Sequence, residues 1–166
     1  MYEIVILVLI FTHFQGLGQT LDSGLTFKTN IDYNNKKANK AISILYCILK
    51  KYSPVKKKLK ILTYKSYIRP ILTYACPTFA HYAKSHMKKL QIIQNKALRM
   101  ALSALYSTRI AELHHEAKIP TIEVFIDKLT KKFYESCDDS SNKLIKRLGK
   151  IQCASKKHRT PKSHLV

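Results

Sequence analysis

Apolar residues recur at intervals of three and four over most of the chain beyond residue 31, a spacing typical of amphipathic α-helices. Glycine is absent from residue 25 to residue 148, so little interrupts this pattern. The helices expected from the spacing cover residues 32–51, 54–68, 71–82, 85–105, 109–118 and 144–148, with one more after Pro120.

Serine and proline residues set the expected helix limits. Ser53 is predicted to cap the second helix, with Pro54 at its first helical position. Pro70 is expected to end or kink that helix, and Pro77 to break the next one. Ser85 is predicted to cap the longest helix.

Two helices carry the clearest apolar stripes. The inward positions of the longest helix are predicted to be Met87, Leu90, Ile93, Ala97, Leu98, Ala101 and Leu105. The stripe of the helix after Pro120 consists of Ile122, Phe125, Ile126, Leu129 and Phe133.

The ends of the chain show other patterns. Residues 1–18 hold an apolar run that is too short for a membrane span; it suits either a signal-peptide core or a β-strand. Glycines and small polar residues over 16–30 are consistent with a short hairpin. Residues 151–166 are basic without apolar periodicity, and we expect them to be disordered.

These patterns predict a mainly α fold, a small helical bundle with a short N-terminal β-hairpin or strand and a disordered basic C-terminal tail. The expected organisation is a leader over 1–18, a helical domain over 19–150 and the tail over 151–166.

Charge is distributed unevenly along the chain. The formal net charge is +20, and no Asp or Glu occurs between Asp32 and Glu112, an interval that holds seventeen Lys or Arg residues. A surface with that composition repels itself, so we expect a polyanion to lie against it. Nucleic acid and an anionic membrane surface are the two partner classes that fit.

Several kinds of catalytic or metal site are disfavoured. Asp138 and Asp139 lack the flanking strands and third carboxylate that a polymerase magnesium site needs, so a solvated loop is the preferred interpretation. Neither the cysteines and histidines around Cys76 nor the pair His114 and His115 has zinc-site spacing. We therefore predict no catalytic residue, no metal and no cofactor. Buried thiols are expected at Cys47 and Cys76.

The basic residues of two helices are the candidate nucleic-acid-binding site. They are expected to line one groove that tracks a phosphate backbone without reading sequence. The candidate residues are Lys56, Lys57, Lys58, Lys60, Lys65, Arg69, Lys84, Lys88, Lys89, Lys96 and Arg99. Aromatic residues between the two sets either stack on bases or fill the core, and core packing is favoured for most of them; they are Tyr64, Tyr67, Tyr74, Phe79 and Tyr82.

Three segments, in order, resemble the region after the catalytic palm in reverse transcriptases of jockey-like non-LTR retrotransposons. They are YKSYIRPILTYACP at 64–77, LQIIQNKALRM at 90–100 and ELHHEAKIPTIEVFIDKLTKKFY at 112–134. Leu17, Gly18 and the segment LDSGLTF at 21–27 are similar to the family's primer-grip turn and the stretch immediately after that turn. The resemblance extends over residues 16–150.

The resemblance implies a thumb and its C-terminal extension, a mostly helical element that holds a template–primer duplex beside a palm. We expect the palm to be missing from these residues, and a separate palm-bearing reverse transcriptase is a candidate partner. The resemblance also implies that these residues alone do not polymerise nucleotides, and it favours a nuclear or cytoplasmic location. Gly16, Phe79, the DDSSN segment at 138–142 and the missing proline at 104–107 depart from the family pattern. The alternative hypothesis is a secreted cationic protein, recruited from a retroelement, that acts on anionic membranes or extracellular nucleic acid.

Overall fold

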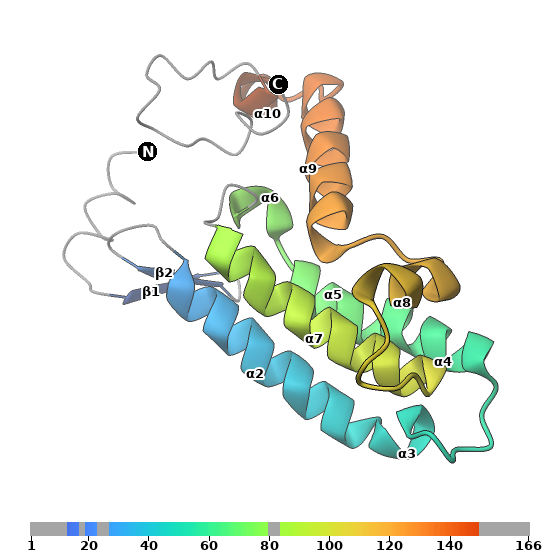
Figure 1. Ribbon diagram of the computed structural model, residues 1–166. Helices are drawn as coiled ribbons and strands as arrows, with labels where there is room; N and C mark the ends of the chain where they lie inside the picture. The colour runs from blue at the N-terminus through green and yellow to red at the C-terminus, as the bar shows by residue number, and fades with distance from the viewer. Residues whose placement is uncertain (1–12, 17–18, 23–26, 80–83, 150–166) are drawn as a thin grey trace.

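The computed structural model describes residues 13–16, 19–22, 27–79 and 84–149. It is mainly helical, as predicted (Figure 1). Two short strands pair antiparallel, with Phe14 opposite Leu21. The elements in chain order are β1 His13–Gly16, β2 Gln19–Asp22, α2 Lys28–Ile44, α3 Tyr46–Leu49, α4 Lys57–Thr63, η1 Tyr64–Ile68, α5 Arg69–Thr73, α6 Cys76–Phe79, α7 Lys84–Leu102, α8 Ile110–Ala117, α9 Ile122–Asp138 and α10 Lys143–Gly149. The leader, apart from 13–16, and the tail lie outside the described residues.

Helices α2 and α7 lie side by side and run in the same direction, with α4, η1 and α5 behind them (Figure 1). The core between them contains the predicted stripe of α7, including Leu90, Ala97 and Leu98 at 0–1% exposure. Burying a side chain of the size of leucine stabilises the fold by roughly 1.5–3 kcal/mol. Leu105 was expected on this stripe but is 67% exposed. The prediction for Leu105 was wrong because α7 ends at Leu102.

Helices α4, η1 and α5 form one unbroken helical run from residue 57 to residue 73. Pro70 does not end it. Proline lacks an N–H, and its ring crowds the preceding helical turn. The π-helical turn η1 lies just before Pro70 and widens the helix at that point. In this turn the Arg69 N–H bonds to the Tyr64 carbonyl, five residues back. The break predicted near Pro77 occurs at Tyr74 and Ala75, where Ala75 has a left-handed backbone.

The predicted cap at Ser53 is not a helix cap. The Ser53 hydroxyl accepts a hydrogen bond from the Val55 N–H at 3.4 Å in a turn, and α4 begins later, at Lys57. The expected helix 32–51 is divided into α2 and α3 at Leu45. These differences move helix ends by a few residues and leave the bundle intact.

Polar side chains of α7 attach the C-terminal helices to the bundle. The Gln91 carbonyl oxygen accepts the Ile122 N–H at 2.9 Å, and the Gln94 amide donates to the Pro120 carbonyl at 3.0 Å. His114 Nδ1 lies 2.9 Å from the Ile119 carbonyl, and its Nε2 lies 3.0 Å from Asn95 Oδ1. His114 therefore has a structural role between α7 and α8.

Candidate nucleic-acid interface

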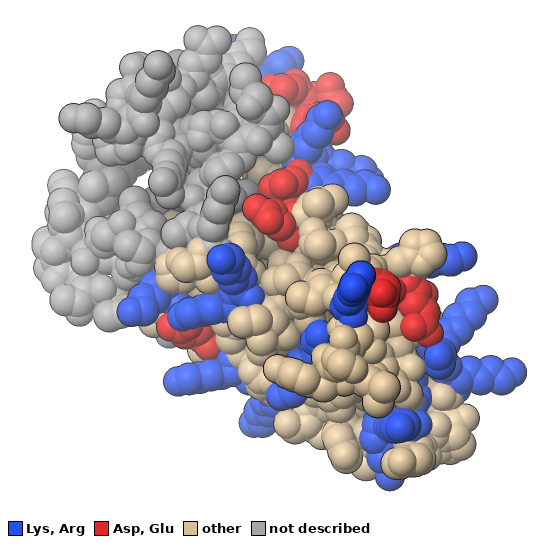
Figure 2. Space-filling model, in the orientation of Figure 1, with Lys and Arg blue, Asp and Glu red and all other residues tan. Residues whose placement is uncertain are grey.

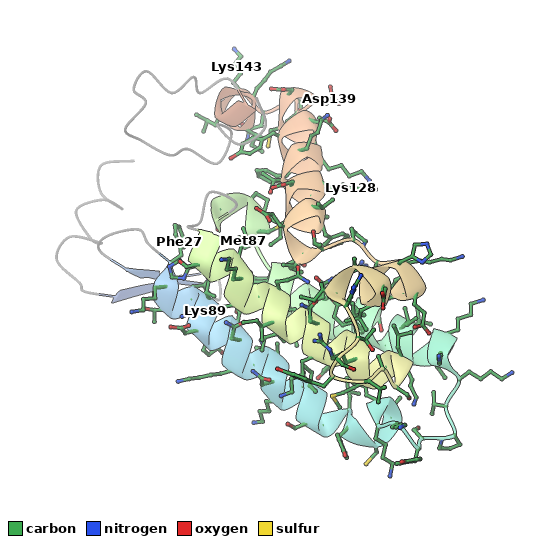
Figure 3. All side chains as sticks on the ribbon, in the orientation of Figure 1. Phe27, Met87, Lys89, Lys128, Asp139 and Lys143 are labelled. Carbon is green, nitrogen blue, oxygen red and sulfur yellow. The ribbon has the colours of Figure 1, made fainter. Side chains whose placement is uncertain are left out.

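Two of the basic residues predicted on α7 face α2. The Lys89 ammonium donates to the Asp32 carboxylate at 2.8 Å, and the Lys96 ammonium donates to the Asn39 side-chain oxygen at 3.0 Å (Figure 3 labels Lys89). The second pair lies seven residues beyond the first on both helices, a distance of about 10 Å along the helix axis. These two contacts define a line between the helices, which we name the α2–α7 seam.

Further lysines lie on α2 near this seam. On α7, Lys88 is exposed one heptad before Asn95, which contacts His114 of α8, so Lys88 lies on the α8 side of that helix. Lys36 lies one helical turn after Asp32 and is exposed, as is Lys40 another turn on. Asp32 is the one carboxylate on the described part of α2, and its hydrogen bond with Lys89 lowers the pKa of that carboxyl below its ordinary value. The seam is therefore a strip of ammonium groups with a single acidic neighbour.

The candidate cations of α4, η1 and α5 lie elsewhere. Lys57 forms a 2.9 Å salt bridge with Glu116 of α8, and the Arg69 guanidinium lies 4.1 Å from the centre of the Phe125 ring on α9. Lys65 is half-buried, while Lys56 and Lys58 are exposed at the start of the run. Two of these side chains thus contact the C-terminal helices.

Lys60 does not have the exposure that a phosphate contact needs. Its side chain is 2% exposed, and its Nζ donates a 2.7 Å hydrogen bond to the Lys50 carbonyl, just after α3. The same carbonyl also accepts the Ser53 N–H at 3.1 Å, so both bonds hold the chain at the end of α3. Lys60 is therefore a packing residue and does not belong to the interface.

The eleven candidate residues are thus not brought together in one groove. Lys89 and Lys96 lie along the α2–α7 seam, Lys88 lies on the α8 side of α7, and Arg99 lies beside Tyr106 near the end of α7. The candidates on α4, η1 and α5 lie toward α8 and α9 or at the start of α4. The side chain of Lys84 is outside the described residues. The prediction of one groove assumed that α7 and α4 present their cations to each other. In the structure α7 presents Lys89 and Lys96 to α2 instead.

The sequence did not predict a pocket that lies at the α3 end of the seam. It encloses about 320 Å³ and is lined by Tyr46, Lys50, Lys51, Arg99, Met100, Ser103, Ala104 and Tyr106. We name it the Arg99 pocket. The signal for it was present in the acid-free interval, which includes Lys50 and Lys51. The proximity of these lysines to Arg99 depends on the parallel packing of α2 and α7, which periodicity does not reveal.

Some of the aromatic and cysteine predictions are confirmed, and others are wrong. Tyr64 is fully buried, as core packing requires, and burial raises the pKa of its phenol. Tyr67 and Tyr74 are about half-exposed, at 51% and 52%, so they do not fill the core. Cys76 is buried, and burial raises the pKa of its thiol to about 11. Cys47 is exposed, contrary to the prediction.

Acidic side chains lie mainly on the C-terminal helices. Figure 2 shows Asp and Glu over α8 and α9, whereas Lys and Arg dominate the edge formed by α2 and α3. Asp138 and Asp139 are exposed, and Asp139 lies at the end of α9 farthest from the bundle (Figure 3). Within the described ranges no three His, Cys, Asp or Glu side chains gather in a way that would hold a metal ion.

A search of the described helices finds none with the length and apolar content that crossing a membrane requires.

Comparison with known proteins gives one class of relative. The chain is 28% identical over 155 residues to the RNA-directed DNA polymerase from mobile element jockey of Drosophila funebris, an alignment that covers 93% of this chain and 17% of the relative. It is 27% identical to the Drosophila melanogaster protein of the same name, over 80% of this chain and 14% of the relative. The probable RNA-directed DNA polymerase from transposon X-element of Drosophila melanogaster is 26% identical, over 81% of this chain and 15% of the relative.

The chain thus spans less than a fifth of the length of these relatives. No protein-family model and no solved structure matches it. The similarity covers most of the chain, and it confirms the resemblance to jockey-like polymerases that the three ordered segments indicated.

Proposed function

We propose that this chain, which is related to RNA-directed DNA polymerases of jockey-like retrotransposons, is a retroelement-derived module. It binds the backbone of an RNA or DNA duplex without reading sequence. Such binding needs cations placed along a line and free of competing carboxylates. The α2–α7 seam carries the proposal, because Lys89 and Lys96 lie along it, Lys36 and Lys40 are exposed on the turns of α2 that follow Asp32, and Asp32 is the one carboxylate on that helix.

The spacing along the seam suits a duplex. One heptad of helix advances about 10 Å, and a duplex advances about 3.4 Å per base pair, so successive seam positions lie about three base pairs apart. Lysine ammonium groups contact phosphate oxygens as mobile point charges and do not fix a base. Contacts of this kind orient a duplex and leave its sequence unread.

We further propose that these 166 residues do not polymerise nucleotides on their own. Nucleotide transfer at two metal ions needs carboxylates that converge on one point. Supporting this view, Asp32 is paired with Lys89 and Glu116 with Lys57, on opposite sides of the bundle. A separate chain with a polymerase palm is the partner that the family resemblance suggests.

Salt titration tests the binding proposal. The logarithm of the affinity for a labelled RNA–DNA duplex should fall linearly with the logarithm of the salt concentration. Replacing Lys36, Lys40 and Lys96 together with Gln should reduce that slope by about three, roughly one unit for each phosphate contact. Measurable affinity is expected at low salt for the unmodified chain.

The matched control replaces three exposed lysines of α9, Lys128, Lys131 and Lys132, with Gln. Both variants lose the same charge, so a long-range effect of net charge would lower the two slopes equally. Equal slopes would contradict the seam as the binding surface. Absent affinity at low salt, or affinity indifferent to salt, would contradict backbone binding altogether.

A further inference from the structure

The Arg99 pocket combines cations with exposed aromatic rings. Lys50 and Lys51 are exposed and line it together with Arg99, and no Asp or Glu is among its lining residues. Tyr46 is 55% exposed and Tyr106 is 92% exposed. Its volume of about 320 Å³ is in the range of small-molecule sites. The ligand that fits is therefore anionic and has a flat ring.

The end of α7 explains how the pocket forms. Ser103 has a left-handed backbone with φ of 57°, and the Ala104 N–H bonds back to the Arg99 carbonyl at 3.0 Å. This reversal is rare for a residue other than glycine and is found at helix ends. It turns the chain so that Tyr106 lies beside Arg99, with 5.6 Å between the guanidinium carbon and the ring centre.

Arg99 has hydrogen-bonding capacity left for a ligand. Its Nη2 lies 3.5 Å from the Thr108 carbonyl, at the limit of a hydrogen bond. Its Nε is buried and has no hydrogen-bond partner within the part of the chain that the structure describes. A buried donor without a partner is costly, and an anion in the pocket would remove that cost.

The helix ends near the pocket oppose an anion, and the basic side chains offset them. Helices α3 and α7 both end close to the lining residues, and the carbonyl end of a helix repels negative charge. The buried Lys60 side chain donates to the Lys50 carbonyl at 2.7 Å and so places positive charge at the end of α3. Lys50, Lys51 and Arg99 in the lining add three further cations.

We propose that the Arg99 pocket holds an unpaired nucleotide of a strand whose paired part lies along the α2–α7 seam. The phosphate contacts Lys50, Lys51 and Arg99, and the base stacks on Tyr106. This inference rests on the proposed duplex binding and extends it to the junction between duplex and single strand. Stacking on tyrosine tolerates every base, in keeping with binding that does not read sequence.

The test uses the full chain and two probes, a blunt RNA–DNA duplex and the same duplex with a short unpaired extension whose first base is 2-aminopurine. We expect the extension to raise affinity about tenfold, as stacking of one base does. We also expect the fluorescence of 2-aminopurine to be quenched on binding. Tyr106→Ala should abolish both effects, whereas Tyr106→Phe, which keeps the ring, should retain them.

Tyr67→Ala is the matched control, since Tyr67 is a half-exposed tyrosine on η1 outside the pocket. Because Tyr106 is almost fully exposed, removing its ring should leave the fold and the blunt-duplex affinity unchanged. Blunt duplex bound without any gain from the extension would overturn the pocket inference alone. Failure of both probes to bind would overturn the proposed function itself.

Two further experiments distinguish a nucleotide from two other ligands of the pocket, a simple anion and a lipid headgroup. Adenosine monophosphate should bind the pocket more tightly than ribose 5-phosphate, and Tyr106→Ala should remove the difference. Equal binding of the two would mean a simple anion site and would overturn base stacking. Vesicles of phosphatidylserine that bind through Tyr106 more strongly than the extended duplex would also overturn it.

Discussion

The bundle (residues 27–109) and the C-terminal helices (residues 110–149) are built by the same helical rules but differ in charge. The bundle carries eighteen Lys or Arg and one acid, Asp32, whereas the C-terminal helices carry seven of each. Both bury apolar stripes, and α7 belongs to the first while packing against the second. A helical core therefore does not dictate the charge of its outer surface, and the proposed polyanion would account for the imbalance of the bundle.

Where the two regions meet, basic residues of the bundle contact the C-terminal helices. Lys57 pairs with Glu116, and Arg69 lies against Phe125. In Figure 1 no other helix is drawn in front of α2, and β2 contacts this helix. Lys89 and Lys96 also have partners within the fold, Asp32 and Asn39, so the two sides differ in what surrounds their cations and not in whether the cations are paired.

The largest expected effect tests whether the two regions are one cooperative unit. Leu98 in the bundle and Ile126 in α9 are both fully buried. Leu98→Ala or Ile126→Ala should each lower the free energy of unfolding by about 2–5 kcal/mol, because a cavity replaces packed side chain. Urea unfolding monitored by circular dichroism should show a single shifted transition in both variants.

Val124→Ala is the control, since Val124 is 58% exposed on α9 and should change stability little. Two separate transitions, with Ile126→Ala shifting one of them, would instead mean that the C-terminal helices unfold independently. The comparison would then be between two domains.

An intermediate effect is expected where the regions are joined. Gln91→Leu removes the acceptor of the Ile122 N–H and leaves that donor unpaired in a part-buried contact. We expect a loss of about 1–3 kcal/mol. Hydrogen exchange of the Ile122 amide measures it, with Ile92→Ala as control because Ile92 is 63% exposed on the same helix. Unchanged protection of that amide would contradict the role of Gln91.

Much of the bundle could be predicted from periodicity, because burial on α7 repeats with the helix. Met87, Leu90 and Ile93 are buried as their spacing predicted. The end of α7 could not be predicted, because the residue with a left-handed backbone there is Ser103 and not glycine, which is the usual sequence signal. Long-range packing was beyond the reach of periodicity: nothing in the spacing of Lys89 shows that it meets Asp32.

Single residues were misplaced for a related physical reason. Lysine is usually exposed, yet the aliphatic stem of Lys60 packs in the bundle while its ammonium finds the Lys50 carbonyl. Only the three-dimensional position of the end of α3 makes that arrangement favourable. The charge imbalance was visible in the sequence, but which helix faces which had to come from the structure.

The smallest expected effect concerns the exposed pair of the seam. Asp32→Asn removes the partner of Lys89, and because both side chains are 42% exposed, the free energy of unfolding should fall by less than about 1 kcal/mol. The pKa of Asp32 is lowered in the folded state, so its contribution is present above the ordinary value of 3.8 and is lost as pH falls through the lower folded pKa.

Urea midpoints of Asp32→Asn and the unmodified chain should therefore differ slightly at neutral pH and converge in strong acid. Duplex affinity should rise modestly in this variant, because the one acid of the bundle is gone. A drop in duplex affinity would indicate that Asp32 positions Lys89 for its contact, and would contradict simple electrostatic repulsion.

The parallel arrangement of α2 and α7 also has a consequence for folding. Asp32 and Lys89 are 57 positions apart, whereas Gln94 reaches Pro120 across only 26. Closing the longer loop costs more chain entropy, so we expect α7, α8 and α9 to associate early and α2 to dock late. Pulse-labelled hydrogen exchange during refolding should show α2 amides as the last to become protected. The lysines that are proposed to contact nucleic acid would then become aligned only in the final step of folding.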